Sequence, residues 1–262
     1  MDHNISAFGE VLESFRRWRL WVLLGWHDLK QRYYRTFLGP LWMTFGLLIF
    51  VSGMGVFWGV LLKVEVRTFI PYFCAGLISW QSIAKPLSEG ATSFISGTSI
   101  IQTTRVPLLM HPLRLTMRTL STYFHALIAY FVVAIVLSVP VNAYSLAIFP
   151  AFAVIFINCF WVSTLLGMIG ARFRDLPPMI DAIIPFLFFL TPILWRPKML
   201  GSWAFTVQYN PLAHFIEVLR NPLLGQPSSP LSYGVVAAVT VIGLIGTFLF
   251  FRRFRSRIIF WL

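Results

Sequence analysis

Long apolar runs alternate with short polar segments along most of the chain. A helix that crosses a bilayer needs about 20 mostly apolar residues. Six runs come close to this length, at 41–62, 69–90, 119–140, 146–170, 178–195 and 231–251. Each is expected to form one helix, so the pattern predicts an all-α polytopic membrane protein with six transmembrane helices.

Two of these runs are less regular than the others. The second contains Lys85 and Glu89 near its end, four residues apart, where a helix places them on one face. The fifth is short and begins with Pro177 and Pro178, which the first turn of a helix tolerates. Asp175, just before the prolines, is expected to cap that helix.

The segment ahead of the first run has a helical pattern of its own. Residues 22–37 place apolar and aromatic residues at spacings of three and four, with polar residues opposite. The pattern predicts an N-terminal amphipathic helix in the membrane interface, and a generic basic anchor beside the membrane is the alternative. Gly39 and Pro40 are expected to turn the chain into the first span. The apolar face comprises Val22, Trp26, Leu29, Tyr33 and Phe37, and the polar face comprises Asp28, Gln31, Arg32 and Arg35.

Residues 196–230 fit neither a span nor an ordinary loop. They are too apolar for a long loop, and Pro211 and Pro222 interrupt them. Two short helices that re-enter the outer leaflet are expected here, before the last span. Irregular backbone at membrane depth needs shelter from protein or from a water-filled cavity, so this segment predicts a translocation path nearby.

Composition and charge agree with a membrane location. The 262 residues are 58% apolar and 11% charged, with a mean hydropathy of +0.77, whereas soluble domains are about a quarter charged. The net charge of +12 is spread between the apolar runs, which suits anionic headgroups rather than nucleic acid. With the N-terminus inside, the inner segments hold 15 Lys and Arg residues and the outer segments 5. Both termini are therefore expected in the cytoplasm.

Candidate catalytic and metal sites are sparse. The sequence contains no GxSxG, HExxH or GxxxxGK[ST] motif, so we expect no catalytic residue, no metal site and no P-loop for ATP in this chain. His214 and Glu217, three residues apart, fit a polar helix face or a metal site. His125 fits a hydrogen-bonded core histidine or a ligand of a polar substrate. Asp181 fits a partner of the helix dipole or a charge that lines a path.

Four blocks of sequence, in this order, resemble a known family. They are "LKQRYYRTFLGPLW", "RFRDLPPMIDAIIPFLFFLTPILW", "YNPLAHFIEVLRNPLL" and the basic end "FFRRFRSRIIFWL". Together they resemble type-2 ABC transporter permeases. The branch they resemble most is the exporters of O-antigen and capsular polysaccharide, with teichoic acid exporters as relatives. The resemblance covers nearly the whole chain, but these blocks do not identify the sugar.

The resemblance implies a homodimer in the bacterial inner membrane, in which residues 39–262 form the six-span transmembrane domain after a cytoplasmic region at 1–38. It also implies a separate ATP-binding cassette subunit, which would hold the ATP and Mg²⁺. The cargo would be a lipid-linked polysaccharide that moves from the cytoplasm to the periplasm. Two alternatives are an ABC permease for a drug or a small lipid, and an integral membrane enzyme that acts on lipid-linked sugars.

Basic segments on the inner side are the expected docking surface for the ATP-binding subunit. Residues 22–37, 97–118 and 172–175 hold most of the inner charge outside the C-terminal tail. Binding to anionic membrane lipids alone is the alternative for these side chains. The predicted coupling residues are Arg32, Arg35, Gly39, Pro40, Arg114, Arg118, Arg174 and Asp175.

Aromatic residues, which make up 17% of the chain, are the candidates for the substrate channel. A sliding polysaccharide needs weak and repeated contacts, and aromatic faces can stack on the apolar face of a pyranose while its hydroxyls stay hydrated. Packing against lipid is the alternative for each of these side chains. The predicted channel residues are Phe45, Trp58, Phe186 and Phe189.

Overall fold

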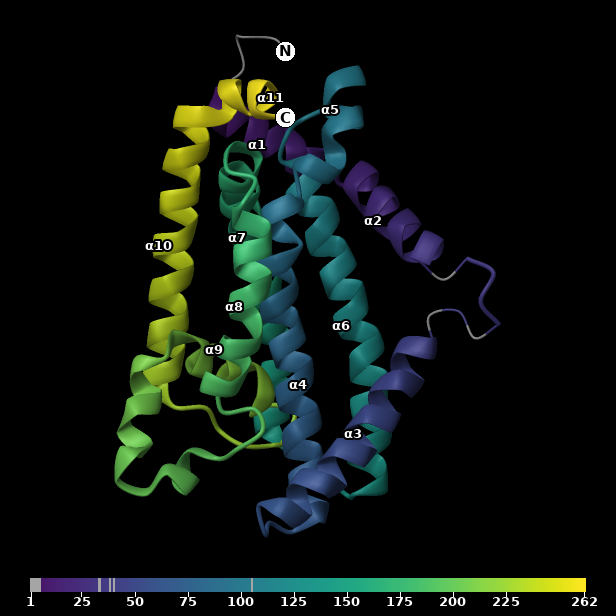
Figure 1. Cartoon of the computed structure of the whole chain (residues 1–262), viewed down its shortest axis with the longest axis vertical. Coiled ribbons are helices and arrows are strands. Elements are labelled where there is room, and N and C mark those ends of the chain that lie inside the picture. Colours follow the sequence, from purple (N-terminus) through teal and green to yellow (C-terminus); the bar gives the residue numbers. More distant parts are fainter. Residues whose placement is uncertain (1–5, 33, 38, 40, 105) are drawn as a thin grey trace.

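The structure is a bundle of helices, seen in a computed structural model that describes residues 6–32, 34–37, 39, 41–104 and 106–262. No strand occurs among these residues. The long helices are α3 (Leu41–Leu61), α4 (Val66–Ser88), α6 (Met110–Val136), α7 (Ile148–Arg172), α8 (Leu176–Leu190) and α10 (Pro230–Phe254) (Figure 1). The shorter helices are α1 (Ala7–Arg16), α2 (Trp18–Arg32), α5 (Thr98–Thr103), α9 (Pro211–Arg220) and α11 (Ile258–Trp261). Single 3-10 turns or short 3-10 helices are η1 (Gly90–Thr92), η2 (Ile95–Gly97), η3 (Ala143–Ala147), η4 (Pro197–Tyr209) and η5 (Arg255–Arg257).

Each of the six predicted runs forms a helix, and four of the resulting segments are long and apolar enough to cross a membrane. These are Leu41–Leu61, Met110–Val136, Ala143–Arg172 and Pro230–Trp261. The other two are α4, which carries polar and charged residues in its second half, and α8, which has 15 residues. The multi-pass prediction is therefore confirmed, with four candidate spans defined by length and composition.

Helix α4 forms the centre of the bundle. It packs against α3, α6, α7, α8 and α9, and every residue from 71 to 80 is buried. Its Phe69, Phe73 and Ile78 are almost inaccessible and share one apolar core with Tyr130 of α6 and Ile216 of α9. Burial on all sides explains why this helix tolerates small and polar residues, because its neighbours are protein side chains rather than lipid.

The predicted interfacial helix is shorter than expected. Helix α2 ends at Arg32, whereas the sequence pattern extended it to 37. Arg35 has a φ of 63° and Phe37 is fully exposed, so the chain leaves the helical path before the predicted turn. Gly39, with a φ of 52°, has the left-handed backbone expected of a glycine at this turn. Tyr33 and Pro40 lie outside the described residues.

The buried face of α2 also differs from the predicted one. Trp21, Gly25 and Leu29 are buried, whereas Trp26 is 44% exposed. A Cβ on Gly25 would lie 3.0 Å from the carbonyl oxygen of Arg114 in α6, so glycine allows a close helix contact at this point. The face that α2 packs on α6 is therefore shifted from the predicted apolar face, and the location of α2 in the membrane interface stays a prediction.

The start of α8 corrects another expectation. Asp175 occupies the N-cap position, but its side chain makes no capping hydrogen bond. An N-cap side chain accepts from the amide at the second or third helical position. Here those positions are Pro177 and Pro178, which have no N–H to donate. The helix ends at Leu190, five residues before the end of the predicted run.

Residues 196–230 form two short helical elements, as the sequence predicted. Element η4 is bent at Gly201, which has a φ of 54°, and α9 begins after Asn210, whose side chain accepts from the amide of Leu212 at 3.0 Å. The α9 side chain of Glu217 accepts from the amide of Ser229 at 2.6 Å, and His214 Nδ1 lies 2.8 Å from Ser232 Oγ. These contacts join α9 to the start of α10. No group of three metal-ligating side chains occurs in the part of the chain that the structure describes.

Both ends of the described chain meet at one end of the bundle. Helices α1 and α11 lie there together (Figure 1). Glu10 of α1 accepts from Arg255 at 3.0 Å, which ties the first helix to the C-terminal turn. The sequence pattern did not predict α1, whose one clear signal is Ser6, the N-cap residue that accepts from the amide of Gly9 at 3.0 Å.

Candidate functional site: a charged network between α2, α4 and α6

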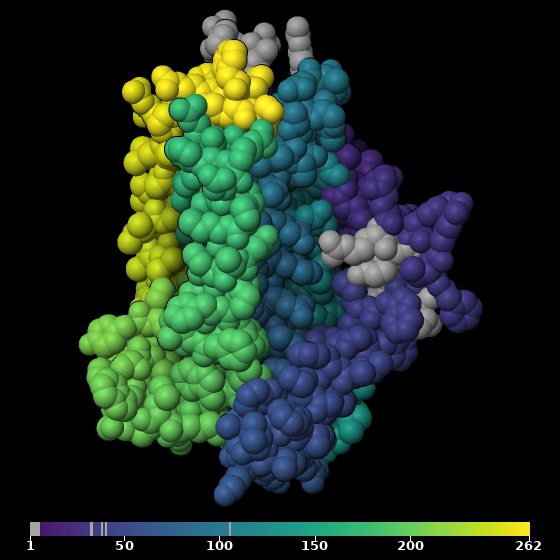
Figure 2. Space-filling view, viewed as in Figure 1, coloured from purple at the N-terminus to yellow at the C-terminus, as the bar shows by residue number. Residues whose placement is uncertain are grey.

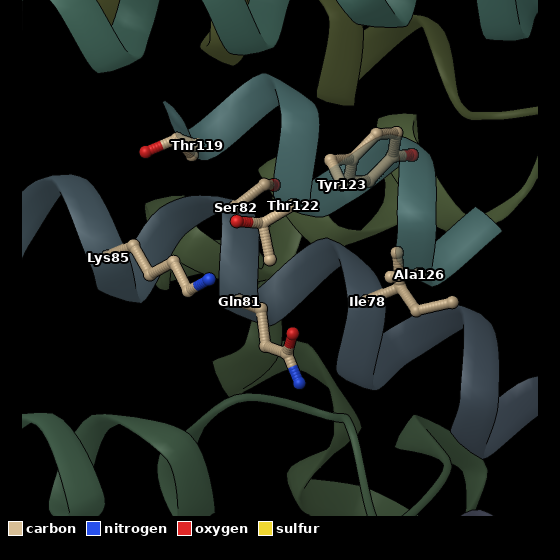
Figure 3. A pocket seen from close by; sticks show the side chains of 8 residues that line it. All are labelled: Ile78, Gln81, Ser82, Lys85, Thr119, Thr122, Tyr123 and Ala126. Atoms are coloured by element: carbon tan, nitrogen blue, oxygen red, sulfur yellow. The ribbon is translucent and has the colours of Figure 1, made fainter. Parts of the chain in front are cut away.

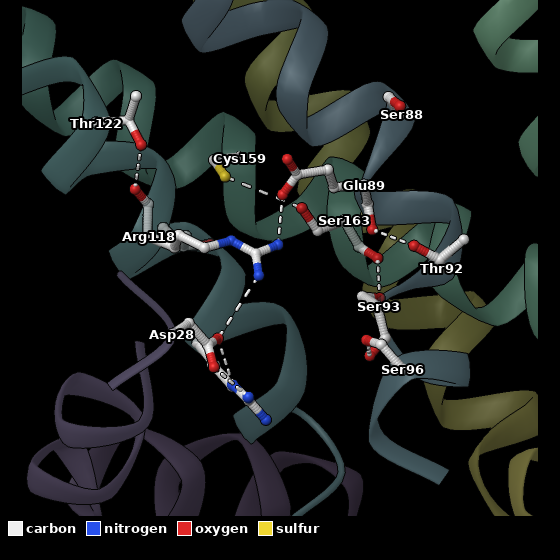
Figure 4. A network of polar contacts seen from close by, with 12 residues as sticks. Asp28, Ser88, Glu89, Thr92, Ser93, Ser96, Arg118, Thr122, Cys159 and Ser163 are labelled. Carbon is white, nitrogen blue, oxygen red and sulfur yellow. Dashed lines mark hydrogen bonds and ion pairs between the residues drawn. The ribbon is translucent and has the colours of Figure 1, made fainter. Parts of the chain in front are cut away.

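Four charged side chains from three elements meet where α2 crosses α6. Arg114 of α6 holds Asp28 of α2 in a bidentate pair, with Nε 2.6 Å from Oδ2. Arg118, one turn further along α6, lies 3.6 Å from the same carboxylate and also pairs with Glu89 at the end of α4. Figure 4 shows Arg118 between Asp28 and Glu89. The two carboxylates and two guanidinium groups balance in charge.

The local sequence explains how the network assembles. Arg114 and Arg118 are four residues apart, so both project from one face of α6. Gly25 allows α2 to approach that face, and Asp28 follows three residues later on the same side of α2. The sequence pattern grouped the two arginines correctly, but it placed Asp28 on the polar face of an interfacial helix and not against α6. The sequence feature that indicates this contact is Gly25, because the absence of a side chain there allows α2 and α6 to approach closely.

Partial burial makes the network stronger than a surface ion pair. The Asp28 side chain is 10% exposed, and those of Arg114, Arg118 and Glu89 are 25%, 26% and 30% exposed. A shielded, bidentate pair of this kind is worth more than the roughly 0–1 kcal/mol of an exposed pair. Loss of one partner leaves the opposite charge poorly compensated, and this penalty is the larger part of the effect.

Polar contacts continue from the network to two further helices. Next to Glu89, the hydroxyl of Ser88 donates to Asp181 of α8. The hydroxyl of Ser93, in the turns after α4, donates to the carbonyl oxygen of Ser163 in α7 at 3.1 Å. Side-chain contacts therefore connect the region around Glu89 to α7 and α8.

The other predicted coupling residues lie outside this network. Arg35 is exposed, and its guanidinium carbon lies 5.5 Å from the centre of the Tyr34 ring. Arg174 donates to the carbonyl oxygens of Trp261 and Leu262, each at 3.3 Å, so it connects the α7–α8 turn to the C-terminus. Asp175 is exposed. The structure describes the backbone of Arg32 but not its side chain, and Pro40 lies outside the described residues.

The four predicted channel aromatics lie on two helices, with Phe45 and Trp58 on α3 and Phe186 and Phe189 on α8. Phe186 and Phe189 of α8 are 65% and 59% exposed, and Phe45 of α3 is 45% exposed. Trp58 is half-buried, with its ring 5.8 Å from that of Phe57 and packed against the main core. The three phenylalanines are therefore available for contact with another molecule, while Trp58 also supports the α3 packing.

A small cavity lies between α4 and α6 (Figure 3). Its volume is about 10 Å³, enough for one water molecule, and its lining includes Ser82, Thr119 and Tyr123. The ring nitrogen Nδ1 of His125, on the next turn of α6, lies 2.8 Å from the carbonyl oxygen of Ser121. This contact fits the interpretation of His125 as a hydrogen-bonded histidine within the bundle.

An all-helical chain with four membrane-length apolar helices is a multi-pass membrane protein. It is similar to an O-antigen export system permease protein RfbA of Klebsiella pneumoniae, with 29% identity over 262 residues and 93% of both chains covered. A second RfbA protein of that species is 28% identical over 261 residues, with 93% of both chains covered, and one from Myxococcus xanthus is 23% identical over 190 residues, or 71% of both. No family model matches the chain. The resemblance to type-2 ABC permeases for O-antigen, predicted from the four sequence blocks, is confirmed by these relatives.

Proposed function

We propose that the chain is the permease subunit of an ABC exporter for O-antigen. The observation that carries this proposal is the similarity to permeases of O-antigen export systems over 93% of the chain. The apolar helices supply the membrane-spanning part such a subunit needs. The function is transport rather than catalysis in this chain, and the work of ATP hydrolysis falls to a separate subunit.

The proposed topology has six spans and cytoplasmic termini in the inner membrane. Helix α4 is 23 residues long and buried, so protein can shelter its polar residues as it crosses. Helix α8 would be the short fifth span, extended by the residues that follow it, and α10 would be the sixth. The position of α1 and α11 at one end of the bundle supports an even number of crossings (Figure 1). Elements η4 and α9 would then form a re-entrant segment on the periplasmic side.

Two kinds of protein partner belong to this proposal. The first is a second copy of the chain, for which the exposed surface of α8 is a candidate. Not one residue of α8 is buried, although the helix is strongly apolar, and Figure 2 shows it on the visible face of the molecule. The second partner is an ATP-binding cassette subunit that binds ATP and Mg²⁺. It would contact the basic elements at the end of the bundle that carries α1 and α11.

The network around Asp28 gives this arrangement a coupling path. Motion of the ATP-binding subunit would displace α2, and the Asp28 contacts would transmit it to Arg114 and Arg118 of α6. Glu89 and Ser88 would carry it to the end of α4 and to Asp181 of α8. A lipid-linked polysaccharide would then pass along the surface that α3 and α8 present, where aromatic side chains offer stacking contacts.

Complementation tests the proposed function directly. A strain that lacks this chain but keeps its ATP-binding subunit should accumulate polysaccharide in the cytoplasm and lose it from the cell surface. The intact chain should restore surface polymer, measured by antibody labelling of whole cells against total polymer in lysates. Restored drug resistance or altered lipid export, with no change in surface polymer, would support the alternative cargo and overturn the proposal.

A further inference from the structure

A cavity that the proposed function does not use lies where α2 leads into α3. It has a volume of about 360 Å³, within the usual range of small-molecule sites. Its walls come from the end of α2, from Tyr34, Arg35 and Gly39, from the start of α3 and from the middle of α6. Figure 1 shows α2 and α3 diverging from this linker on the side of the molecule away from α10.

The lining combines positive charge with an apolar wall. Lys30 and Arg35 are its cations, and no carboxylate is among the described lining residues. Asp28, the nearest acidic residue along α2, is held by Arg114 and Arg118 in the charged network. The cavity therefore favours an anion, and Met43 offers that ligand an apolar contact.

We propose that this cavity binds the headgroup of an anionic phospholipid. Lys30 and Arg35 would bind the phosphate through charge-assisted hydrogen bonds. Trp26 and Tyr34, which also line the cavity, are the aromatic residues that membrane proteins place at headgroup depth. A polyanion with no apolar part would leave the apolar surface of Met43 and Trp26 uncovered, so a lipid fits the lining better than free phosphate does.

The neighbouring surface of α6 is open to the acyl chains of such a lipid, because Phe124, the residue before His125, is 53% exposed. The lipid would join α2 to α3 across Gly39, at the point where the backbone turns. Its binding would thereby set the angle between the two helices, whatever cargo the chain carries.

Lipid binding by the full-length purified chain tests the proposal without any transport assay. Native mass spectrometry in detergent measures the binding of phosphatidylglycerol and of phosphatidylcholine separately. In the Lys30→Gln/Arg35→Gln variant, affinity for phosphatidylglycerol should fall about tenfold or more, while affinity for phosphatidylcholine should change little. The matched control is Arg252→Gln/Arg253→Gln, which removes two exposed arginines at the end of α10 and should keep wild-type binding.

Three further measurements make the result decisive. The charge-conserving variant Lys30→Arg/Arg35→Lys should keep selective binding, which separates charge recognition from misfolding. Met43→Trp, which fills part of the cavity, should lower phosphatidylglycerol binding with both cations present. Inorganic phosphate at millimolar concentration should not displace the lipid. Equal phosphatidylglycerol affinity in the double glutamine variant, or displacement by phosphate alone, would overturn the proposal.

Discussion

Asp28 of α2 and Arg114 of α6 form a bidentate pair across two helices that are separated by 86 positions in the sequence, with Arg114 Nε 2.6 Å from Asp28 Oδ2. Arg118 approaches the same carboxylate at 3.6 Å. One acidic residue therefore holds α2 against two basic residues of α6. This makes Asp28 the residue on which the attachment of α2 most depends.

Replacement of Asp28 by Ala should therefore weaken both folding and coupling. The variant leaves Arg114 without its carboxylate in a partly buried position, which costs about 2 kcal/mol of unfolding free energy. Thermal unfolding in detergent should show a lower Tm, and the exporter should hydrolyse ATP with less stimulation by substrate. Arg114→Lys should give a smaller loss, because lysine keeps the charge but not the bidentate geometry.

Glu13 provides the control for this prediction. It pairs with Arg17 on the surface of α1, with side chains 32% and 43% exposed, so Glu13→Ala should change stability by about 0.5 kcal/mol or less. Equal Tm values for Asp28→Ala and Glu13→Ala would show that the network does not hold α2 in place.

Gly25→Val should separate α2 from α6. A Cβ at this position meets the Arg114 carbonyl oxygen and the Met117 Cβ at 3.0 Å each, and the branched side chain of valine needs still more room. We expect a loss of about 1–3 kcal/mol, measured by thermal unfolding. Gly46→Ala is the matched control, because no atom lies within 4 Å of a Cβ on Gly46 of α3, and it should be neutral or stabilising. A Gly25→Val variant as stable as wild type would contradict the close contact.

The sequence predicted those parts of the fold that depend on local apolar pattern. The run at 41–62 became α3, Leu41–Leu61, and the run at 231–251 became α10, Pro230–Phe254, with small changes at their ends. Length and hydropathy determine such helices, so their position needs no knowledge of the neighbours. Helix α6 differs, since it begins at Met110 rather than at 119. Its extra turns carry Arg114 and Arg118, whose polar character hid them from an apolar criterion.

The candidate site was less predictable, because it depends on contacts between distant segments. The grouping of Arg114 with Arg118 followed from their spacing. The orientation of Asp28 did not, since it is decided by α6 packing at Gly25. Asp175 shows the same limit at shorter range, because a residue type suited to capping met two prolines with no amide to donate. The sequence pattern identifies these residues, whereas their contacts with neighbouring segments determine which interactions their side chains make.

Variants in the turn between α7 and α8 can distinguish an effect on coupling from an effect on stability. Asp175 makes no capping bond, so Asp175→Asn should leave the Tm unchanged. Charge reversal in Asp175→Lys should lower substrate-stimulated ATP hydrolysis if the partner subunit docks at this turn. Arg174→Glu should lower it as well, and should also release the contacts of Arg174 with the carbonyl oxygens of Trp261 and Leu262. Normal stimulation in both reversal variants, with normal membrane insertion, would exclude this turn from the docking surface.

Thiol labelling in whole cells tests the proposed topology. Cysteine at Gln226, which is exposed after α9, should react with a membrane-impermeant maleimide that has access to the periplasm. Cysteine at Ser256, also exposed but next to the C-terminus, should react only after the inner membrane is permeabilised. Background labelling should be low because Cys74 and Cys159 are buried. The opposite labelling order would invert the orientation. Labelling of both sites from the periplasm would show that α10 does not cross the membrane between them.

Phe186 and Phe189 provide the test of the substrate path. Both side chains are more than half exposed, so Ala at these positions removes little packing and should leave protein abundance unchanged. If their rings stack on the passing sugars, the double variant should lower surface polymer several-fold, measured against total polymer in lysates. Phe149→Ala is the matched control, because Phe149 of α7 is 68% exposed and was not assigned to the path. Equal surface polymer in the double variant and the control would show that the α8 rings contact lipid or the second subunit instead.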